Sequence, residues 1–462
     1  MKTYAFERLY QDKQCWIAPA YVTVDAAGTI TAVGSEAPDD GTPVEHHRGL
    51  VLPGFQNAHS HAFQYAMAGL AEFATRPDDD FWSWRTAMYD LALRVGPEQL
   101  EAIATMLYAE MVRHGYTAVA EFHYLHHDVD GRPYAEPALL SHCLMRAAAR
   151  AGIHLTLVPM FYRLGGFDQP ATAQQRRFLS PDTDAYLDLL AAVHKTAASF
   201  AHVTVGAGVH SLRAASRADI QFLLGEADLR GPLHLHIAEQ TGEVAACEAR
   251  WGQRPVAWLL DHVAVDARFH LVHATHVTEA EWRGMVKAGA NAVICPSTEG
   301  NLGDGFFPID DYHAAGGAWC IGTDSHVGLS PLEELRWLDY GRRLQRRRRN
   351  VMCPDVGADG GVEMVDRAFH GGRAAMGAAA QKGYFAVGTP FDAVLVDSDH
   401  PLLAVCEPDR LIATLIYAGD VTFIRTLFQA GTVRVENGRH READAIRAAF
   451  SSALRALNSR GN

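Results

Sequence analysis

The chain of 462 residues is 48% hydrophobic and 21% charged, with a formal net charge of −13 at pH 7. This composition is typical of a globular protein, and the acidic balance disfavours nucleic acid as a partner. No apolar run approaches the ~20 residues of a membrane helix, and residues 1–16 lack the apolar core of a secretory signal. The seven cysteines are never spaced as CxxC, which argues against a disulfide framework or a structural zinc knuckle. We therefore expect a cytoplasmic protein with no membrane partner.

The two ends of the chain have the same strand-like texture. Near the amino end, WIAPAYVTVD and TITAVG flank a turn at residues 26–28, a pattern typical of a β-hairpin. Near the other end, FDAVLVDSD and TVRVENGRH repeat that pattern. We expect residues 1–48 and 386–440 to form one small β unit that the rest of the chain interrupts. Residues 441–462 carry apolar side chains at helical spacing and predict a carboxyl-terminal helix.

Strand-like and helix-like segments alternate through residues 49–385. Strand candidates such as HLTLVPMFY, PLHLHIAE and FHLVHAT are separated by helical candidates such as DAYLDLLAAVHKTAASF and PVAWLLDHV. Such alternation predicts βαβ units and a parallel sheet. About eight strand candidates occur between residues 50 and 325, which favours a closed barrel over an open sheet. Residues 163–184 have little periodicity, and we expect a long loop there, near the active face.

Four short segments bear histidine or aspartate, and each follows an apolar, strand-like run. In chain order they are residues 59–61 (HSH), 236–239 (HIAE), 273–276 (HATH) and 322–325 (GTDS), and the first of them follows the predicted strand GLVLPGF at residues 49–55. Distant segments meet at strand ends when their strands lie side by side, and a closed parallel barrel gathers catalytic groups at the carboxyl ends of its strands. The segments therefore predict one active site at the mouth of a barrel.

The side chains of these segments suit a hydrolytic metal centre. His59 and His61 are two residues apart, so an extended strand directs both imidazoles to the same face. His234 and His236 are paired in the same way, and one of them could supply a third ligand. Asp324 ends an apolar strand, where an unpaired carboxylate would be costly to bury. Such ligands are typical of zinc with an open position for water, although iron(II) and manganese also accept them.

The segments LPGFQNAHSH, HIAE, HATH and GTDS resemble those of the amidohydrolase superfamily, in its mononuclear deaminase branch. The resemblance implies an α/β fold, a (β/α)8 TIM-like barrel with a small β-sandwich domain formed by the N- and C-terminal segments. It also implies that His59, His61, His236 and Asp324 hold one divalent metal ion, which we expect to be zinc. Dinuclear members use a bridging lysine on an intermediate strand, and the matching strand here, at residues 202–211, has no lysine, which favours a single ion.

The same resemblance implies catalytic roles for three residues of these segments. His273 matches a histidine that orients the attacking water and stabilises developing charge. Glu239 is placed to pass a proton to the nitrogen that leaves. Asp324 can accept the proton of the water as well as bind the metal, because a divalent ion lowers the pKa of bound water to about 7.

Polar residues outside these segments indicate an anionic substrate. Arg85 lies among aromatic residues in FWSWR, where it either stacks on the surface or binds a carboxylate through two hydrogen bonds. Arg213 and His210 follow a strand end in VGAGVHSLR, and Gln64 and Tyr124 follow two other strands. A second arginine at the active face of an acidic protein needs a counter-charge, which a dicarboxylate supplies and a nucleobase does not.

The segments FWSWR, AEFHY and VGAGVHSLR are similar to those of the formimidoylglutamate deiminase family. That family hydrolyses N-formimino-L-glutamate to N-formyl-L-glutamate and ammonia in histidine breakdown. The resemblance implies a homodimer, and it implies that the substrate carboxylates are held by Gln64, Arg85, Tyr124, His210 and Arg213. Two alternatives stay open. One is another mononuclear deaminase, acting on guanine, cytosine or an adenosine derivative, and the other is a catalytically inactive barrel that serves as a binding protein.

Overall fold

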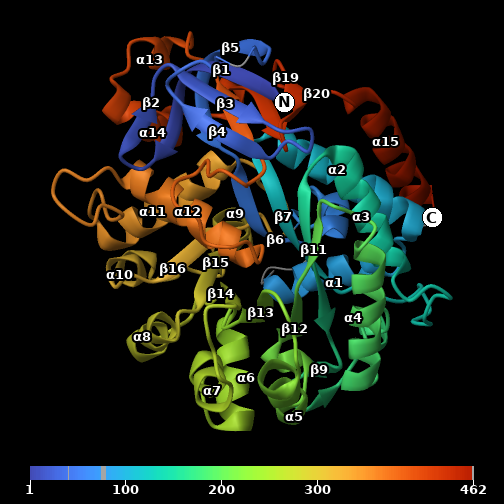
Figure 1. Cartoon of the computed structure of the whole chain (residues 1–462). Helices are drawn as coiled ribbons and strands as arrows, with labels where there is room; N and C mark the ends of the chain where they lie inside the picture. Colours follow the sequence, from blue (N-terminus) through green and yellow to red (C-terminus); the bar gives the residue numbers. More distant parts are fainter. Residues whose placement is uncertain (40, 74–79, 460–462) are drawn as a thin grey trace.

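The computed structural model describes residues 1–39, 41–73 and 80–459 of the chain. Eight parallel strands form the central sheet, in the order β16-β15-β14-β13-β12-β8-β7-β6. An isolated parallel bridge between Ser60 and Asp324 joins the two ends of this order, so the sheet closes into a barrel (Figure 1). The predicted TIM-like barrel is confirmed. Its strands are β6 (Phe55–Ser60), β7 (Tyr116–His123), β8 (His154–Phe161), β12 (Ala207–Ser211), β13 (Leu233–Ile237), β14 (Phe269–His273), β15 (Asn291–Ile294) and β16 (Ala318–Ile321).

Helices surround the barrel between its strands (Figure 1). In α2, proline stands at the first position, where no N–H is needed, and buried residues recur every three or four positions from Leu100 to Met111. α3 ends at Gly152, whose φ of 72° is a conformation that glycine adopts without strain. The helices are α1 (Phe81–Ala92), α2 (Pro97–Arg113), α3 (Leu139–Ala151), α4 (Thr183–Ala197), α5 (Arg217–Gln221), α6 (Thr241–Trp251), α7 (Pro255–His262), α8 (Glu279–Ala288), α9 (Pro296–Leu302), α10 (Ile309–Ala314), α11 (Pro331–Arg346), α12 (Gly360–Ala375), α13 (Pro401–Ala404), α14 (Leu411–Ala418) and α15 (Ala443–Ser459).

The two ends of the chain share a second sheet, seen as blue and red strands side by side in Figure 1. Its core includes Tyr4, Phe391 and Phe428, with the ring centroid of Phe428 5.2 Å from that of Tyr4 and 5.4 Å from that of Phe391. An antiparallel bridge between Thr29 and Pro390 links the two chain segments again. The predicted β-sandwich is confirmed. Its strands are β1 (Lys2–Asp12), β2 (Cys15–Ile17), β3 (Ala20–Val24), β4 (Ile30–Gly34), β5 (Val44–Pro53), β17 (Ala393–Val396), β18 (Ile424–Gln429), β19 (Thr432–Glu436) and β20 (Arg439–His440).

The prediction of one barrel strand at residues 49–55 is wrong. Residues up to Pro53 belong to β5 of the small sheet, and the barrel strand begins at Phe55. Gly54 lies between them, where a Cβ would come within 2.2 Å of Thr117 Oγ1. Glycine therefore lets the chain cross between the two sheets at a close backbone approach. The apolar run is continuous in the sequence because both strands are buried there.

Two other predicted segments are more divided than expected. The strand at residues 203–211 is interrupted after Val205, which gives β11 (Val203–Val205) and β12, both paired with β8. The segment at residues 163–184 contains a short hairpin of β9 (Leu164–Gly166) and β10 (Gln169–Pro170), followed by a 3-10 turn at Ala173–Gln175. That turn brings one buried side chain of the segment to the active face, as described below.

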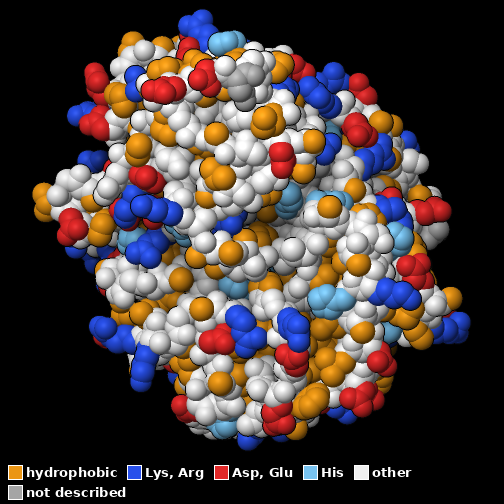
Figure 2. Space-filling view, viewed as in Figure 1, with side chains coloured by type: hydrophobic (Ala, Val, Ile, Leu, Met, Phe, Trp, Pro, Cys, Tyr) orange, Lys and Arg blue, Asp and Glu red, His pale blue; other side chains and the backbone are white. Residues whose placement is uncertain are grey.

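The carboxyl-terminal helix α15 packs against α2 on the outside of the barrel. Residues 460–462 of the predicted helix, and residue 40 of the amino-terminal segment, lie outside the described residues. None of the helices in the described part of the chain is long and apolar enough to cross a membrane. Figure 2 shows acidic and basic side chains interspersed with apolar ones over the visible face.

Candidate metal centre and active site

The four predicted metal ligands come together at the carboxyl ends of β6, β13 and β16. Nitrogen and oxygen atoms of His59, His61, His236 and Asp324 all lie within 4.8 Å of one another. His59 Nε2 is 3.1 Å from His61 Nε2 and 3.0 Å from His236 Nε2. Asp324 Oδ1 is 3.3 Å from His61 Nε2 and 3.5 Å from His59 Nε2. His234, the alternative third ligand, instead contacts the backbone carbonyl of Ala375 through its Nε2 at 2.9 Å.

The ring nitrogens of the histidines show which atoms are free for a metal. His61 Nδ1 lies 2.9 Å from the carbonyl oxygen of Phe122, and His236 Nδ1 lies 3.0 Å from that of His210. A carbonyl only accepts, so both Nδ1 atoms carry hydrogen and both Nε2 atoms present lone pairs. Burial lowers the pKa of His61 to about 3 and that of His236 well below its usual value. Neutral imidazoles that direct lone pairs at one point, beside a carboxylate, fit a divalent cation.

Buried polar side chains hold the ligand-bearing strands in register. Asn57 on β6 donates from Nδ2 to Thr323 Oγ1 at 2.7 Å and accepts from the Thr323 backbone N–H at 3.0 Å. Glu121 on β7 accepts from Ser60 Oγ and from the Ala62 N–H, each at 2.6 Å. Burial raises the pKa of Glu121 to about 7. These contacts lie next to His59 and His61 at the end of β6 and next to Asp324 after β16. They therefore fix the directions of these three side chains.

A second group of possible ligands, formed by His273, Cys295 and Asp324, shares its aspartate with the first. Burial raises the pKa of the Cys295 thiol well above its usual value, so the thiol stays protonated. The first group offers four ligands against three and needs no thiolate. It is therefore the better metal site.

His273 ends β14 beside the metal ligands and lies among three carboxylates. Its Nδ1 is 3.2 Å from Glu299 Oε1, and its Nε2 is 3.8 Å from Glu239 Oε1 and 3.7 Å from Asp324 Oδ2. Burial disfavours the charged imidazole, but these carboxylates outweigh burial and raise the pKa of His273 to about 10. In the chain alone, the imidazole is therefore a donor on both sides, with one N–H directed towards Glu239 and the pocket.

Several residues around the site, among them Ala238, His273 and Asp324, have a left-handed backbone that is uncommon outside glycine. Their φ angles are 51° for Ala238, 68° for His273 and 47° for Asp324. Such strain costs about 1–3 kcal/mol per residue, and it clusters at functional sites. Glu239 follows the first of these residues. Burial, opposed by His273 and Arg213, raises the pKa of Glu239, which favours a carboxyl group able to give up a proton.

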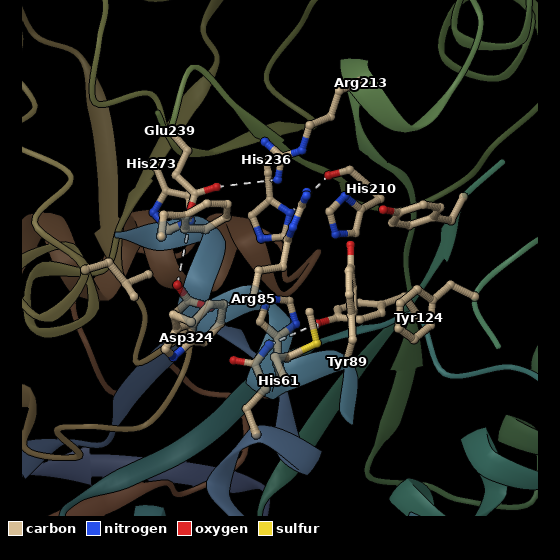
Figure 3. Close-up of a pocket in the computed structure, with 17 residues that line it drawn as sticks. His61, Arg85, Tyr89, Tyr124, His210, Arg213, His236, Glu239, His273 and Asp324 are labelled. Carbon is tan, nitrogen blue, oxygen red and sulfur yellow. Dashed lines mark hydrogen bonds and ion pairs between the residues drawn. The ribbon is translucent and has the colours of Figure 1, made fainter. Parts of the chain in front are cut away.

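The five residues predicted to bind substrate line a single pocket, together with Glu239, His273 and three of the metal ligands. In Figure 3 the two arginines point into the space between Glu239 and Tyr89. Because anion-binding groups and the metal ligands share one pocket, a ligand could contact both sets at once. The five residues are Gln64, Arg85, Tyr124, His210 and Arg213.

Arg85 comes from α1, a helix that was not predicted. Its guanidinium carbon lies 4.3 Å from the centre of the Trp82 ring and 5.5 Å from that of Tyr89. The arginine therefore stacks on an aromatic ring, as one of the two predicted arrangements has it, and also lines the pocket, while its binding of a carboxylate stays a prediction. Among the described residues its close partners are aromatic rings rather than carboxylates, which leaves its charge available to an anionic ligand.

Arg213 is held differently, by two buried carboxylates. Its Nη1 is 3.1 Å from Glu243 Oε2, and its Nη2 is 3.7 Å from Glu239 Oε2. Glu243 also accepts from the backbone N–H groups of Ala238, at 3.3 Å, and Glu239, at 3.1 Å. One carboxylate thus connects an arginine predicted to bind substrate to the backbone of Glu239, the predicted proton shuttle.

Sequence reasoning missed much of the pocket wall and most of the supporting carboxylates. Tyr89 falls one helical turn after Arg85, so a helix predicted over residues 81–92 would have placed both on one face. Glu121, Glu243 and Glu299 have no local spacing that marks them, because their partners come from other elements. The other pocket residues are Phe81, Trp84, Met88, Tyr89, Tyr162, Phe178 and Leu302.

Comparison with known proteins gives a consistent assignment. A sequence model of the amidohydrolase family matches residues 50–432. Formimidoylglutamate deiminase of Pseudomonas aeruginosa is 47% identical over 442 residues, which cover 95% of this chain and 96% of that protein. An amidohydrolase of Brucella melitensis has a similar crystal structure, with a TM-score of 0.90 and 38% identity over 99% of this chain and 100% of that one. An adenosine deaminase of Xanthomonas campestris, solved with bound zinc, shares the fold, with a TM-score of 0.80 and 22% identity over 99% and 98% of the two chains. The chain therefore belongs to the amidohydrolase family, in the group of the formimidoylglutamate deiminases.

Proposed function

We propose that this protein hydrolyses N-formimino-L-glutamate to N-formyl-L-glutamate and ammonia, in the degradation of histidine. The proposal is carried by one observation: two arginines line the same pocket as three members of a three-histidine, one-aspartate cluster. The cluster fits metal-dependent hydrolysis, and the arginines fit a dicarboxylate better than a nucleobase. The relative named formimidoylglutamate deiminase supports the same substrate.

In this proposal His59, His61, His236 and Asp324 hold a single zinc ion. When bound, the ion supplies a Lewis acid that lowers the pKa of a water molecule at its open position. The converging lone pairs of the imidazoles support the ligand set. The absence of lysine from residues 202–211 supports one ion rather than two.

The substrate carboxylates would be held by the polar residues that line the pocket with Glu239. Arg85 binds one of them, and Arg213 binds the other with His210, Gln64 and Tyr124. Holding both ends of the substrate keeps the formimino carbon next to the metal ligands and removes much of the entropic part of the barrier.

Two carboxyl groups then transfer the protons, and one imidazole donates a hydrogen bond. Asp324 accepts the first proton of the attacking water as the new C–O bond forms, and that proton neutralises the imine nitrogen. Glu239 delivers a proton to the nitrogen as the C–N bond breaks and recovers one from the hydroxyl, so the nitrogen leaves as ammonia and the hydroxyl becomes the formyl carbonyl. His273 donates a hydrogen bond to the oxygen on which negative charge develops. Water thus supplies both protons that ammonia carries away.

Three broader predictions accompany this function. We propose a cytoplasmic homodimer. We also propose a division into a β-sandwich made of the two end segments of the chain, a metal-dependent barrel between them, and a terminal helix at residues 441–462. The first boundary, predicted between residues 48 and 49, is placed at Gly54, because β5 runs to Pro53 in the small sheet. The pairing of β5 with β17 supports the joining of the two β-sandwich segments.

Ammonia release from N-formimino-L-glutamate tests the function directly. The purified protein should contain about one metal ion per chain, in line with the four-ligand cluster, and should release one ammonia per substrate consumed. Guanine, cytosine and adenosine derivatives, assayed in parallel, should be turned over far more slowly. Failure of the metal-replete protein to act on N-formimino-L-glutamate, or faster turnover of a base, would contradict the proposal.

A further inference from the structure

A buried glutamine joins two tyrosines that face the pocket. Gln175 ends the 3-10 turn at Ala173–Gln175 and is 1% exposed. Its Nε2 donates to Tyr162 OH at 2.7 Å and to Tyr89 OH at 3.1 Å. Both tyrosines line the pocket that holds the metal ligands and the arginines.

The orientation of the Gln175 amide is fixed by a backbone group. The Thr172 backbone N–H lies 2.7 Å from Gln175 Oε1, and Thr172 Oγ1 lies 3.2 Å from the same atom. A backbone N–H can only donate, so the atom it faces must be the amide oxygen. The amide nitrogen therefore faces the tyrosines, and each of its two hydrogens serves one phenol oxygen.

This arrangement determines what the phenols can do in the pocket. Each phenol oxygen already accepts a hydrogen bond from Gln175, and each still carries its own hydrogen to donate. Burial raises the pKa of Tyr162, which keeps that phenol in its neutral, donating form. Even when one phenol donates to the other, one hydroxyl hydrogen remains for a ligand in the pocket. This wall of the pocket therefore presents donors.

Arg85 and His210, which lie next to the two phenols, extend this wall of hydrogen-bond donors. The guanidinium carbon of Arg85 lies 5.5 Å from the centre of the Tyr89 ring. The ring of His210 lies 4.6 Å from that of Tyr162, between ring centres. A wall of hydroxyl, guanidinium and imidazole groups matches a ligand group that only accepts hydrogen bonds and carries negative charge, which a carboxylate does.

We propose that Tyr89 and Tyr162, oriented by Gln175, donate hydrogen bonds to one carboxylate of the substrate and so help to select a dicarboxylate. This inference rests on the proposed function and deepens it, because it adds a second kind of donor beside the arginines. Tyr89 and Tyr162 contact substrate in this proposal. Gln175 is a positioning residue, which acts through the two phenols.

Conservative variants test the proposal. Tyr89→Phe and Tyr162→Phe keep the ring and remove the donor, so the KM for N-formimino-L-glutamate should rise about 10- to 100-fold while kcat changes little. Gln175→Glu should have the same effect, because a carboxylate accepts the phenol hydrogens and turns them away from the pocket. Tyr312→Phe is the matched control, since its hydroxyl donates to the Ala290 carbonyl at 2.8 Å outside the pocket.

Truncated substrates separate binding from damage to the fold. N-formimino-L-alanine keeps the carboxylate next to the formimino nitrogen, and N-formimino-4-aminobutyrate keeps the distant one. The two phenylalanine variants should lose efficiency with the compound whose carboxylate meets the phenols and behave like the wild type with the other. An equal loss on all three substrates, or an unchanged KM, would overturn the proposal.

Glutarate binding supplies a readout that does not need turnover. Calorimetry on the metal-loaded protein should show weaker glutarate binding by about tenfold or more in Tyr89→Phe, Tyr162→Phe and Gln175→Glu than in the wild type and Tyr312→Phe. If the wild type fails to hydrolyse any formimino compound but this difference is found, the proposed function fails and the carboxylate site stands. Equal glutarate affinity in all five proteins would overturn the carboxylate site itself.

Discussion

Replacing Glu243 perturbs Arg213 and the backbone of Glu239 together. The Glu243 carboxylate is 2% exposed, contacts the arginine at 3.1 Å, and accepts from two backbone N–H groups at 3.1 and 3.3 Å. In Glu243→Ala the guanidinium keeps only the more distant Glu239, at 3.7 Å. In Glu243→Gln an amide oxygen can still accept from the backbone, but the negative charge is gone.

The expected magnitudes differ between the two variants. Removing one partner of a buried ion pair costs about 3–5 kcal/mol, so Glu243→Ala should lower the free energy of unfolding by about that amount. Hydrogen bonds to charged groups are worth about 1 kcal/mol more than neutral ones, so Glu243→Gln should lower stability by only about 1 kcal/mol. Its effect on activity should be larger, because Arg213 then turns towards Glu239 and away from the substrate. A loss of about 10- to 100-fold in kcat/KM corresponds to about 1.4–2.8 kcal/mol.

Denaturant unfolding and steady-state kinetics with N-formimino-L-glutamate measure the two effects separately. Glu248→Gln provides the matched control, since it makes the same chemical change on the exposed face of α6. Wild-type stability and kcat/KM in Glu243→Gln would refute the reasoning. Equal losses in the Glu243 and Glu248 variants would refute it as well.

Three further predictions concern the proposed chemistry. Glu239→Gln should bind the metal normally but lose about 10²- to 10⁴-fold in kcat, measured by metal analysis and ammonia release, and wild-type turnover would remove Glu239 from the mechanism. Arg85→Ala should raise KM about 10- to 100-fold with a smaller change in kcat, whereas an unchanged KM would mean that the arginine only stacks on Trp82. Removing the metal with a chelator should lower the melting temperature, and adding zinc should restore it. A melting temperature that does not respond to metal would argue against an ion bound by the folded state.

The sequence predicted the metal-ligand candidates that stand at strand ends and missed the buried carboxylates that support the site. His59, His61 and Asp324 could be predicted because the periodicity of buried strands places such residues at one rim of a barrel. Glu243 could not, since its partner Arg213 lies 30 residues earlier, in the turn that follows β12, and no spacing in the chain encodes that meeting.

The chemistry of single residues was also more predictable than their secondary structure. Arg85 was expected to bind an anion, but the aromatic residues around it concealed α1, so Tyr89 on the next turn was overlooked. The strand predicted at residues 49–55 failed for a related reason. Two buried strands in different sheets are as apolar as one, and Gly54, where a Cβ would collide with Thr117, marks the crossing between them.

The metal ligands lie where the barrel closes, so a bound ion would also hold the barrel closed. β6 and β16 are the first and last strands of the barrel, and the described residues join them through a short seam. Backbone hydrogen bonds of 3.0–3.2 Å link residues 59–61 to residues 323–324 there, whereas β13 and β14 pair along five residues. His59, His61 and Asp324 stand on opposite sides of this seam. An ion bound by these three residues would link the first strand of the barrel to the last. Among the barrel strands of the metal-free protein, we therefore expect the fastest exchange of amide hydrogens at residues 59–61 and 323–324.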